Sequence, residues 1–430
     1  MTLALSWTDH FFLIVLLFCF IIFLRSTRKA HTRLALKHIF KKPIAVTSAL
    51  ILMFFLTIGV LDSIHLNLDK HRTDVSVLDV ILAPLGDTYE QSYSSPFALT
   101  LFSTELVMVG DTAAQVYPRL RYVAAIKNDK ARTRMIIQSI GHTIWMSLLF
   151  AMMLWGGFRM AGKKLTKSIG VTLSILFFLT VLSYLLSRTF HILGTGQIGQ
   201  DIFYYAVKSI RTGLIIGILT TLFMMPIALF AGIAAGYFGG FVDDAIQYVY
   251  TTLSSIPGAL LITASGLSMQ TYIANHPQYF KSADARLLAL CFILGLTSWT
   301  SLCRLLRAEA LKLREIDFVL AATALGSGPF RIIRKHLLPN VMHIVIITLV
   351  LDFSFLVLAE AVLSYVGVGV SPLTISWGNM INAARLELAR EPVVWWPMFA
   401  AFSFMFTLVL ASNLFADVVR EAFDPHANHE

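Results

Sequence analysis

The segment Arg304–Asn340 reads RLLRAEALKLREIDFVLAATALGSGPFRIIRKHLLPN and separates two long apolar runs of the chain. It is strongly basic and rich in alanine, and a Gly-Ser-Gly-Pro break interrupts it. Glycine is favoured just after a helix C-terminus because it tolerates positive φ, and proline suits the first turn of a helix. The segment therefore predicts a helix over 307–325 that ends at Gly326, and a second short helix that begins at Pro329.

The composition of the whole chain is that of a membrane protein. Of its 430 residues, 57% are hydrophobic and only 14% are charged, whereas soluble domains carry about 25% charged residues. A net charge of +9 would by itself suggest a nucleic-acid partner. The Lys and Arg residues, however, cluster beside apolar runs, as the positive-inside rule predicts. We therefore expect a lipid bilayer and no nucleic acid around this chain.

A helix needs about 20 apolar residues to cross the hydrocarbon core of a bilayer. On that measure nine candidate spans follow one another: Trp7–Leu24, Pro43–Leu61, Met135–Trp155, Ser168–Leu186, Thr212–Tyr237, Asp244–Leu267, Ala285–Leu302, Val341–Val366 and Trp395–Val418. Their lengths exclude barrel strands, and only helices or closed barrels satisfy the backbone in lipid. The sequence predicts an all-α, polytopic membrane helix bundle.

Basic residues also predict the orientation of the bundle. They cluster between spans one and two, three and four, and seven and eight. These three connections lie on the cytoplasmic face only if the N-terminus is outside and the C-terminus is inside. The region 62–134 then faces the exterior. Composition divides the chain near residue 190 into N-terminal spans (1–190) and a second part (191–425) that holds nearly every recognisable motif.

Two enzyme-like readings of the sequence fail. Gly194, Gly196 and Gly199 form a GxGxxG pattern, but a dinucleotide site needs a preceding strand and an acidic residue about 20 positions later. Here an apolar span precedes the glycines, and Thr220 and Thr221 stand at that later position.

The chain also lacks the GxxxxGK[ST] phosphate loop. Its three cysteines, which lie in or beside apolar spans, form no CxxC pair and predict no metal site.

Small residues in the 304–340 segment suggest a docking element. Ala321, Ala322 and Ala324 would let a partner approach the helix backbone closely, next to Leu325 and Gly326. The competing interpretation is an amphipathic helix that lies in the membrane interface, with its basic residues on lipid headgroups.

The segment resembles the "EAA" coupling loop of type I ABC importer permeases, in particular those of the dipeptide, oligopeptide and nickel branch. Ala321-Ala322 and Gly326 match the loop, and Leu338-Pro339 match its end, while Leu320 takes the glutamate position and His336 replaces an isoleucine. The coupling role implied by this resemblance falls on Ala321, Ala322, Leu325 and Gly326, with Pro329 fixing the turn.

Further motifs of the same family follow in the same order. The stretch 194–201 resembles the "GTD-x-x-GRD" start of the permease core, with Gly196 and Gln200 in place of an aspartate and the arginine. The stretch 360–369 resembles the "E-x-x-LSFLGLG" end of the fourth core helix. Other matches are Arg211–Leu214, Ala234–Asp243, Ser255–Pro257, Ser376–Gly378, Trp395-Trp396, Asn413-Leu414 and Asp417. The resemblance covers roughly Gly194 to Pro425 and implies a five-helix core preceded by about four additional spans.

The resemblance implies a non-catalytic permease subunit in the bacterial inner membrane. Such a subunit moves peptides or similar small solutes and pairs with a homologous second permease. Two ATPase subunits bind the ATP and Mg²⁺, and an exterior solute-binding protein delivers the cargo. No cofactor is expected on this chain itself.

Polar groups inside a membrane are costly and are candidates for function. Asp352 and Glu360 lie eight residues apart on one predicted span, and Pro257 is expected to bend another. These three residues are candidates for lining a translocation path, although both carboxylates could instead bond neighbouring helices. They also leave open a proton-coupled carrier without an ATPase. A membrane scaffold that binds an exterior protein through 62–134 is the third alternative.

Overall fold

The structure is a computed structural model that describes residues 2–3, 6–26, 39–67, 75–109, 112–124, 126, 128–160, 167–276 and 283–423. The chain forms two compact units. Unit 1 comprises 1–5, 37–212 and 375–414, and unit 2 comprises 6–36, 213–374 and 415–430. Both units draw on sequence before and after residue 190. The division at residue 190 is predicted from composition and motifs, whereas these two units are defined by packing. It therefore stays a prediction.

Seven of the nine predicted spans coincide with one helix each and two coincide with a pair of helices, and the all-α polytopic prediction is confirmed. These helices are α1 (Trp7–Ser26), α3 (Pro43–Ser63), α6 (Asp129–Met160), α7 (Lys167–Ser187), α8 (Ile202–Phe238), the pair α9 and α10 (Gly240–Ser255, Gly258–Asn275), the pair α11 and α12 (Ala283–Ser298, Thr300–Arg314), α15 (Leu338–Val366) and α17 (Trp396–Phe423). Six helices of the described chain are long and apolar enough to span a membrane, or eight spans result if each bent pair counts as one. The first predicted span, α1, has only a shorter apolar stretch.

The sixth predicted span is not one straight helix. α9 and α10 meet at an angle of 91°, and Ile256 and Pro257 form the break between them. Pro257 has no N–H to donate, so the helix ladder cannot continue through it. The predicted bend at Pro257 is therefore present and larger than a simple kink.

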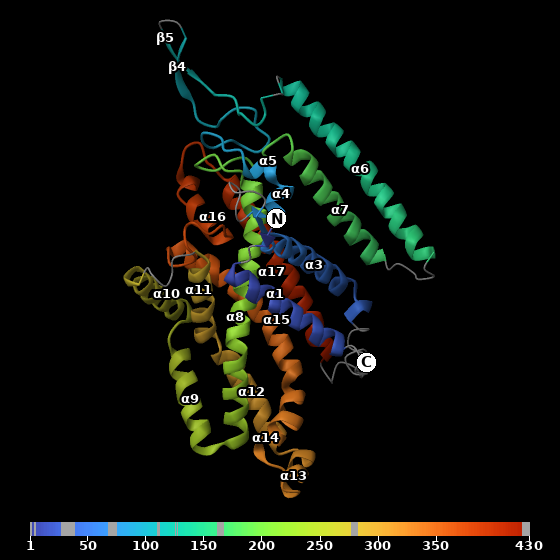
Figure 1. The fold of residues 1–430 in the computed structure, drawn as a ribbon, viewed down its shortest axis with the longest axis vertical. Helices are drawn as coiled ribbons and strands as arrows, with labels where there is room; N and C mark the ends of the chain where they lie inside the picture. Colours follow the sequence, from blue (N-terminus) through green and yellow to red (C-terminus); the bar gives the residue numbers. More distant parts are fainter. Residues whose placement is uncertain are drawn as a thin grey trace. The chain divides into compact units, whose positions relative to one another are not determined.

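Unit 1 contains small elements that hydropathy does not reveal. Strands β1 (Thr2–Leu3), β2 (His65–Asn67) and β3 (Val75–Ser76) form one antiparallel sheet, and β4 (Glu105–Val109) and β5 (Thr112–Val116) form a hairpin. The short helices α4 (Val77–Ile81) and α5 (Ala83–Gly86) follow β3, and α16 (Trp377–Ala384) and η2 (Glu387–Ala389) precede α17. The predicted polar region 62–134 is thus an ordered part of unit 1 over its described residues, with the β4–β5 hairpin projecting from it (Figure 1).

This region has an apolar core of its own. Leu101, Leu120 and Val123 are buried together with Leu186 of α7 and with Phe190, which follows α7. The core therefore joins the 88–126 segment to the chain just before α8, within unit 1.

Candidate coupling surface

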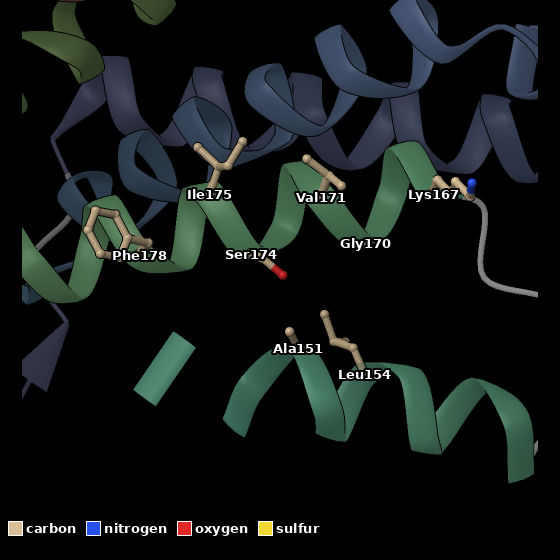
Figure 2. A pocket seen from close by; sticks show the side chains of 8 residues that line it. All are labelled: Ala151, Leu154, Lys167, Gly170, Val171, Ser174, Ile175 and Phe178. Atoms are coloured by element: carbon tan, nitrogen blue, oxygen red, sulfur yellow. The ribbon is translucent and has the colours of Figure 1, made fainter. Parts of the chain in front are cut away.

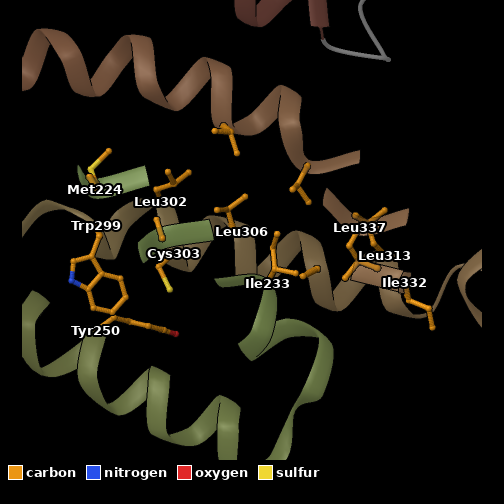
Figure 3. Packing of buried hydrophobic residues seen from close by; sticks show 14 of the residues in the cluster. Met224, Ile233, Tyr250, Trp299, Leu302, Cys303, Leu306, Leu313, Ile332 and Leu337 are labelled. Atoms are coloured by element: carbon orange, nitrogen blue, oxygen red, sulfur yellow. The ribbon is translucent and has the colours of Figure 1, made fainter. Parts of the chain in front are cut away.

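The predicted docking segment lies in unit 2 and is built on an apolar core. It consists of α12, α13 (Asp317–Ala324), α14 (Pro329–Ile332) and η1 (Ile333–Leu337), and it leads into α15. The core contains residues from six helices and η1 (Figure 3). They are Met224, Ala228 and Ile233 of α8, Tyr250 of α9, Leu302, Cys303, Leu306, Ala310 and Leu313 of α12, Val319 of α13, Ile332 of α14, Leu337 of η1, and Val341 and Val345 of α15, with Trp299 just before α12. The docking segment is therefore a packed part of unit 2 and not a free loop.

The single helix predicted over 307–325 is wrong. α12 ends at Arg314, and α13 begins at Asp317 after Ile316 adopts an extended conformation (φ −79°, ψ 142°). The break lets both Leu313 and Val319 reach the same core, because each of them is buried there. Tertiary packing thus overrides a local helix propensity that alone would have continued.

The turn predicted at Gly326 is confirmed. Gly326 has φ +75°, its N–H donates to the Thr323 carbonyl (2.9 Å), and the Ser327 N–H donates to the Ala322 carbonyl (3.0 Å). This pair of bonds is the Schellman motif, which satisfies the last carbonyls of a helix. Pro329 then occupies the first turn of α14, as predicted.

The second short helix does not stop before the eighth predicted span. α14, η1 and α15 form one continuous helical segment, Pro329–Val366. η1 is a π-helical turn in which the Leu338 N–H donates to the Ile333 carbonyl, five residues back. In a regular helix the ring of Pro339 would clash with the carbonyl group four residues before it. The π-helical turn changes the direction of the carbonyl groups just ahead of Pro339. α14 is consequently continuous with a helix that is long and apolar enough to span a membrane.

Large apolar side chains remain exposed around the α13–α14 turn. Leu325 is 86% exposed and Phe330 is 74% exposed, and Phe318 on α13 is also exposed. Ala321 is exposed beside them. We call these four residues the apolar tip. In contrast, Ala322 packs against the core described above, so the structure separates Ala321, which a partner can touch, from Ala322, which holds α13 in place.

Positive charge flanks the apolar tip. Arg331, Arg334 and Lys335 are exposed on α14 and η1. None of the three has an ion-pair partner among the described residues, whereas Lys312 and Arg314 on α12 pair with Glu309 and Glu315. An apolar contact area with a basic rim is suited to a protein partner that presents an apolar groove with acidic groups near it.

The end of α8 approaches α12 very closely, and the sequence analysis missed the signal for this contact. Gly232 and Gly236 are four residues apart on α8, the spacing by which small residues let membrane helices touch backbone to backbone. A Cβ atom at Gly236 would lie 2.5 Å from the Ala310 Cβ and 2.7 Å from the Arg307 carbonyl oxygen. The same α12 is tied to α9, because Arg307 Nη2 donates to Asp243 Oδ2 (2.6 Å) and Nε donates to Oδ1.

This close contact makes a testable prediction. We expect Gly236→Val to lower the free energy of unfolding by about 3 kcal/mol, because the added atoms overlap the backbone of α12. Gly157→Val in α6 is the matched control, since a Cβ at Gly157 meets nothing within 4 Å; it should change stability by no more than ~0.5 kcal/mol. Thermal unfolding of both variants in detergent measures the difference, and equal midpoints would contradict the prediction.

The three residues proposed to line a translocation path all lie in unit 2 but are not equivalent. Glu360 on α15 is buried and accepts a hydrogen bond from the Ser364 hydroxyl one turn later (2.8 Å). Asp352 is only partly buried, and its Oδ2 atom has no hydrogen-bond partner among the described residues. Pro257 is exposed at the α9–α10 break.

Comparisons with known proteins show the family to which the chain belongs. Residues 228–429 match the family described as binding-protein-dependent transport system inner membrane component. The oligopeptide transport system permease protein of Mycobacterium tuberculosis is 31% identical over 237 residues, which cover 55% of this chain and 76% of that protein. The chain belongs to this family of inner membrane permease components.

Two dipeptide transport system permease proteins are also similar to this permease. That of Lactococcus lactis is 30% identical over 240 residues, and that of Bacillus subtilis is 28% identical over 235 residues. The alignments cover 56% and 55% of this chain, and 65% and 68% of the relatives. This permease therefore spans just under two thirds of the Lactococcus protein, and the resemblance to the permease family found in its motifs is confirmed.

Two tryptophans of the family motifs fix the part of the permease that lies in unit 1. Trp396 Nε1 donates to the Thr195 carbonyl (3.0 Å), and Trp377 Nε1 donates to the Ala206 carbonyl (2.9 Å). Gly194, which begins the glycine-rich stretch, has φ +69° and lies against the Ser94 carbonyl, where no side chain fits. The glycine pattern is thus a tight turn before α8.

A buried charged group that the sequence analysis did not anticipate stabilises the same turn. Asp201 caps α8 by accepting a hydrogen bond from the Tyr204 N–H (2.7 Å), and its other oxygen lies 2.6 Å from His191 Nδ1. His191 Nε2 lies 3.7 Å from Glu90 Oε1. Glu90 in turn accepts hydrogen bonds from the N–H groups of Arg121 and Tyr122 (3.0 and 2.8 Å). His191 therefore stands between two buried carboxylates.

The charge of His191 follows from this environment. Burial by itself would lower the pKa of His191, but the hydrogen bonds and charges of Asp201 and Glu90 outweigh burial and raise the pKa to about 9. The imidazole is therefore positively charged at neutral pH and offsets the two buried carboxylates.

A second polar group joins α3, α4 and α8 within unit 1. Lys208 Nζ on α8 lies 2.5 Å from Asp79 Oδ1 and 3.9 Å from Asp62 Oδ1. The Tyr204 hydroxyl donates to Asp79 (2.6 Å), and the Ser76 hydroxyl donates to Asp62 (2.7 Å). No local pattern identifies these residues, since more than a hundred positions separate Asp79 from its partners on α8.

Proposed function

We propose that this permease is one of two membrane subunits of an ABC importer that moves peptides or similar small solutes across the bacterial inner membrane. The names of its relatives, dipeptide and oligopeptide transport system permease proteins, support this substrate class. The observation that carries the proposal is the apolar tip, which unit 2 exposes on a rigid, basic helical support. The permease itself would be non-catalytic.

The apolar tip is the proposed docking site for an ATPase subunit. Leu325 and Phe330 supply the apolar contact, Gly326 and Pro329 set the turn that presents it, Ala321 allows close approach, and Ala322 supports it from behind. A homologous second permease would dock a second ATPase in the same way. ATP and Mg²⁺ would then be bound by the two ATPases, and their closure would move α14 and, through η1, the spanning helix α15.

Asp352, Glu360 and Pro257 are proposed to lie along the translocation path. The partly buried Asp352 carboxylate, with Oδ2 unsatisfied among the described residues, is suited to attract the ammonium group of a peptide. Pro257 would bend the pore-lining pair α9 and α10. An exterior solute-binding protein would deliver cargo on the face where the predicted orientation puts 62–134. The basic connections 27–38 and 161–166 and the tail 424–430, on which that orientation partly depends, lie outside the described residues.

The test is to purify the tagged full-length chain in mild detergent and to identify its partners by mass spectrometry. We expect a second permease and ATPase subunits to co-purify. Reconstitution of that complex with its binding protein should give uptake that requires ATP and survives a protonophore. Uptake by the isolated chain that collapses with the proton gradient would instead establish the proton-coupled carrier, and stable binding of an exterior protein without any uptake would establish the scaffold.

A further inference from the structure

A groove runs between α6 and α7 on a part of the permease that the proposed transport function does not use. It has a volume of about 480 Å³ and is lined by Ala151, Leu154, Lys167, Gly170, Val171, Ser174, Ile175 and Phe178. Small side chains at Ala151, Gly170 and Ser174 create the space, and Ser174 points from α7 toward Ala151 on α6 (Figure 2). Its volume lies within the range of small-molecule sites, about 300–1,000 Å³.

The two helices that form the groove pack against each other. The rings of Phe150 and Phe177 stack across the helix pair, with centroids 4.1 Å apart and planes inclined by 8°. Both helices are membrane-span candidates. Only 6% of the most apolar stretch of α6, and 11% of that of α7, is buried. Val171 and Ile175, on the rim of the groove, are more than half exposed. The groove is therefore preformed and opens toward the environment of the helices, which is the bilayer.

The length of the groove matches one leaflet of a bilayer. Lys167 and Phe178 mark its ends on α7, and at 1.5 Å per residue they are about 16 Å apart along the helix. Half of a hydrocarbon core is about 15 Å thick. With Lys167 at the polar boundary, Phe178 would reach approximately the bilayer midplane, so one acyl chain fits the apolar part of the groove.

Among the described residues that line the groove, Lys167 at its polar end is the one charged side chain. Lys167 is exposed at the first residue of α7 and has no ion-pair partner among the described residues. Arg159, at the end of α6, is held over the Trp155 ring with its guanidinium 5.3 Å from the ring centroid. The sequence between them adds Lys163 and Lys164, and no Asp or Glu occurs between Asp129 and Asp201. A headgroup with negative charge is therefore favoured there over a zwitterionic one.

From these observations we propose that the α6–α7 groove binds one anionic phospholipid. One acyl chain would lie along Ala151, Gly170, Ser174 and Phe178, and the headgroup phosphate would pair with Lys167. Arg159, at the adjacent end of α6, would add attraction without direct contact. None of the residues of this site belongs to unit 2, which holds the proposed ATPase docking site.

Native mass spectrometry can test this proposal. The full-length permease would be reconstituted in nanodiscs that contain equal amounts of phosphatidylglycerol and phosphatidylcholine with the same acyl chains, and the retained lipid would be measured. We expect phosphatidylglycerol to be retained preferentially at one molecule per chain. Lys167→Gln should reduce that preference about fivefold, the effect of one basic residue near an anionic headgroup. Ser174→Phe should fill the groove and reduce retention of both lipids.

Matched controls separate the site from general effects. Lys130→Gln removes a charge at the opposite end of α6, and Leu148→Phe enlarges an exposed residue of α6 outside the groove; both should retain phosphatidylglycerol as the unmodified chain does. Retention of the two lipids in the nanodisc ratio would overturn the proposal, as would undiminished retention by Ser174→Phe. A dimer of this chain that Ser174→Phe abolishes, with no bound lipid, would show that a second copy occupies the groove.

Discussion

Replacing Leu325 or Gly326 by aspartate should uncouple transport from ATP hydrolysis while the permease still folds. Leu325 is 86% exposed, so Leu325→Asp removes no packing. Gly326 has φ +75° and open space around its Cα, and aspartate is among the residues that tolerate this conformation. Either substitution puts a carboxylate into the apolar contact. A charge buried there without a partner should cost about 3 kcal/mol, which is roughly a hundredfold in affinity for the ATPase.

Co-purification of the ATPase and ATP-driven uptake in proteoliposomes would measure this effect. Leu373→Asp is a matched control, because Leu373 is 87% exposed and follows the opposite end of α15 from the tip. It should retain the ATPase, and all variants should elute as a single folded species. Normal uptake and ATPase retention by both Leu325→Asp and Gly326→Asp would exclude the apolar tip as the coupling contact.

Removing the charge of His191 should strongly destabilise unit 1. His191→Gln leaves Glu90 and Asp201 buried without the cation between them, and breaking a buried ion pair in this way costs about 3–5 kcal/mol. His276→Gln is a suitable control, because His276 is only partly buried at the end of α10 and bonds a backbone carbonyl one turn back. Thermal unfolding in detergent compares the two variants, and a His191→Gln midpoint equal to that of the control would contradict the prediction.

The same group predicts how stability depends on pH. The pKa of His191 is raised from 6.5 to about 9 on folding, so the unfolded chain loses this proton at a lower pH than the folded chain does. The stabilisation is complete below pH 6.5 and is lost as the pH rises through about 9. A shift of this size corresponds to about 3 kcal/mol. We expect the unfolding midpoint to fall between pH 6.5 and 9, and this fall should be absent in His191→Gln.

Hydropathy and turn chemistry predicted much of this protein because both act locally. Apolar length placed helices at all nine predicted spans, two of them as bent pairs. Gly326 and Pro329 marked their turn, and Pro257 marked the break between α9 and α10. The conformation of each of these residues depends mainly on its own backbone and on a few neighbours. The composition of the chain alone established that it lies in a membrane.

Long-range packing decided what the sequence could not. Ala321 and Ala322 are equivalent in sequence, yet only Ala322 faces the core, because the break at Ile316 sets the rotation of α13. Glu90 lies 101 positions from His191, and no spacing rule connects two such residues before the chain has folded. The tertiary structure decides which small residue faces a partner and which charges neutralise each other in a buried site. Both depend on surfaces that meet only after the chain has folded.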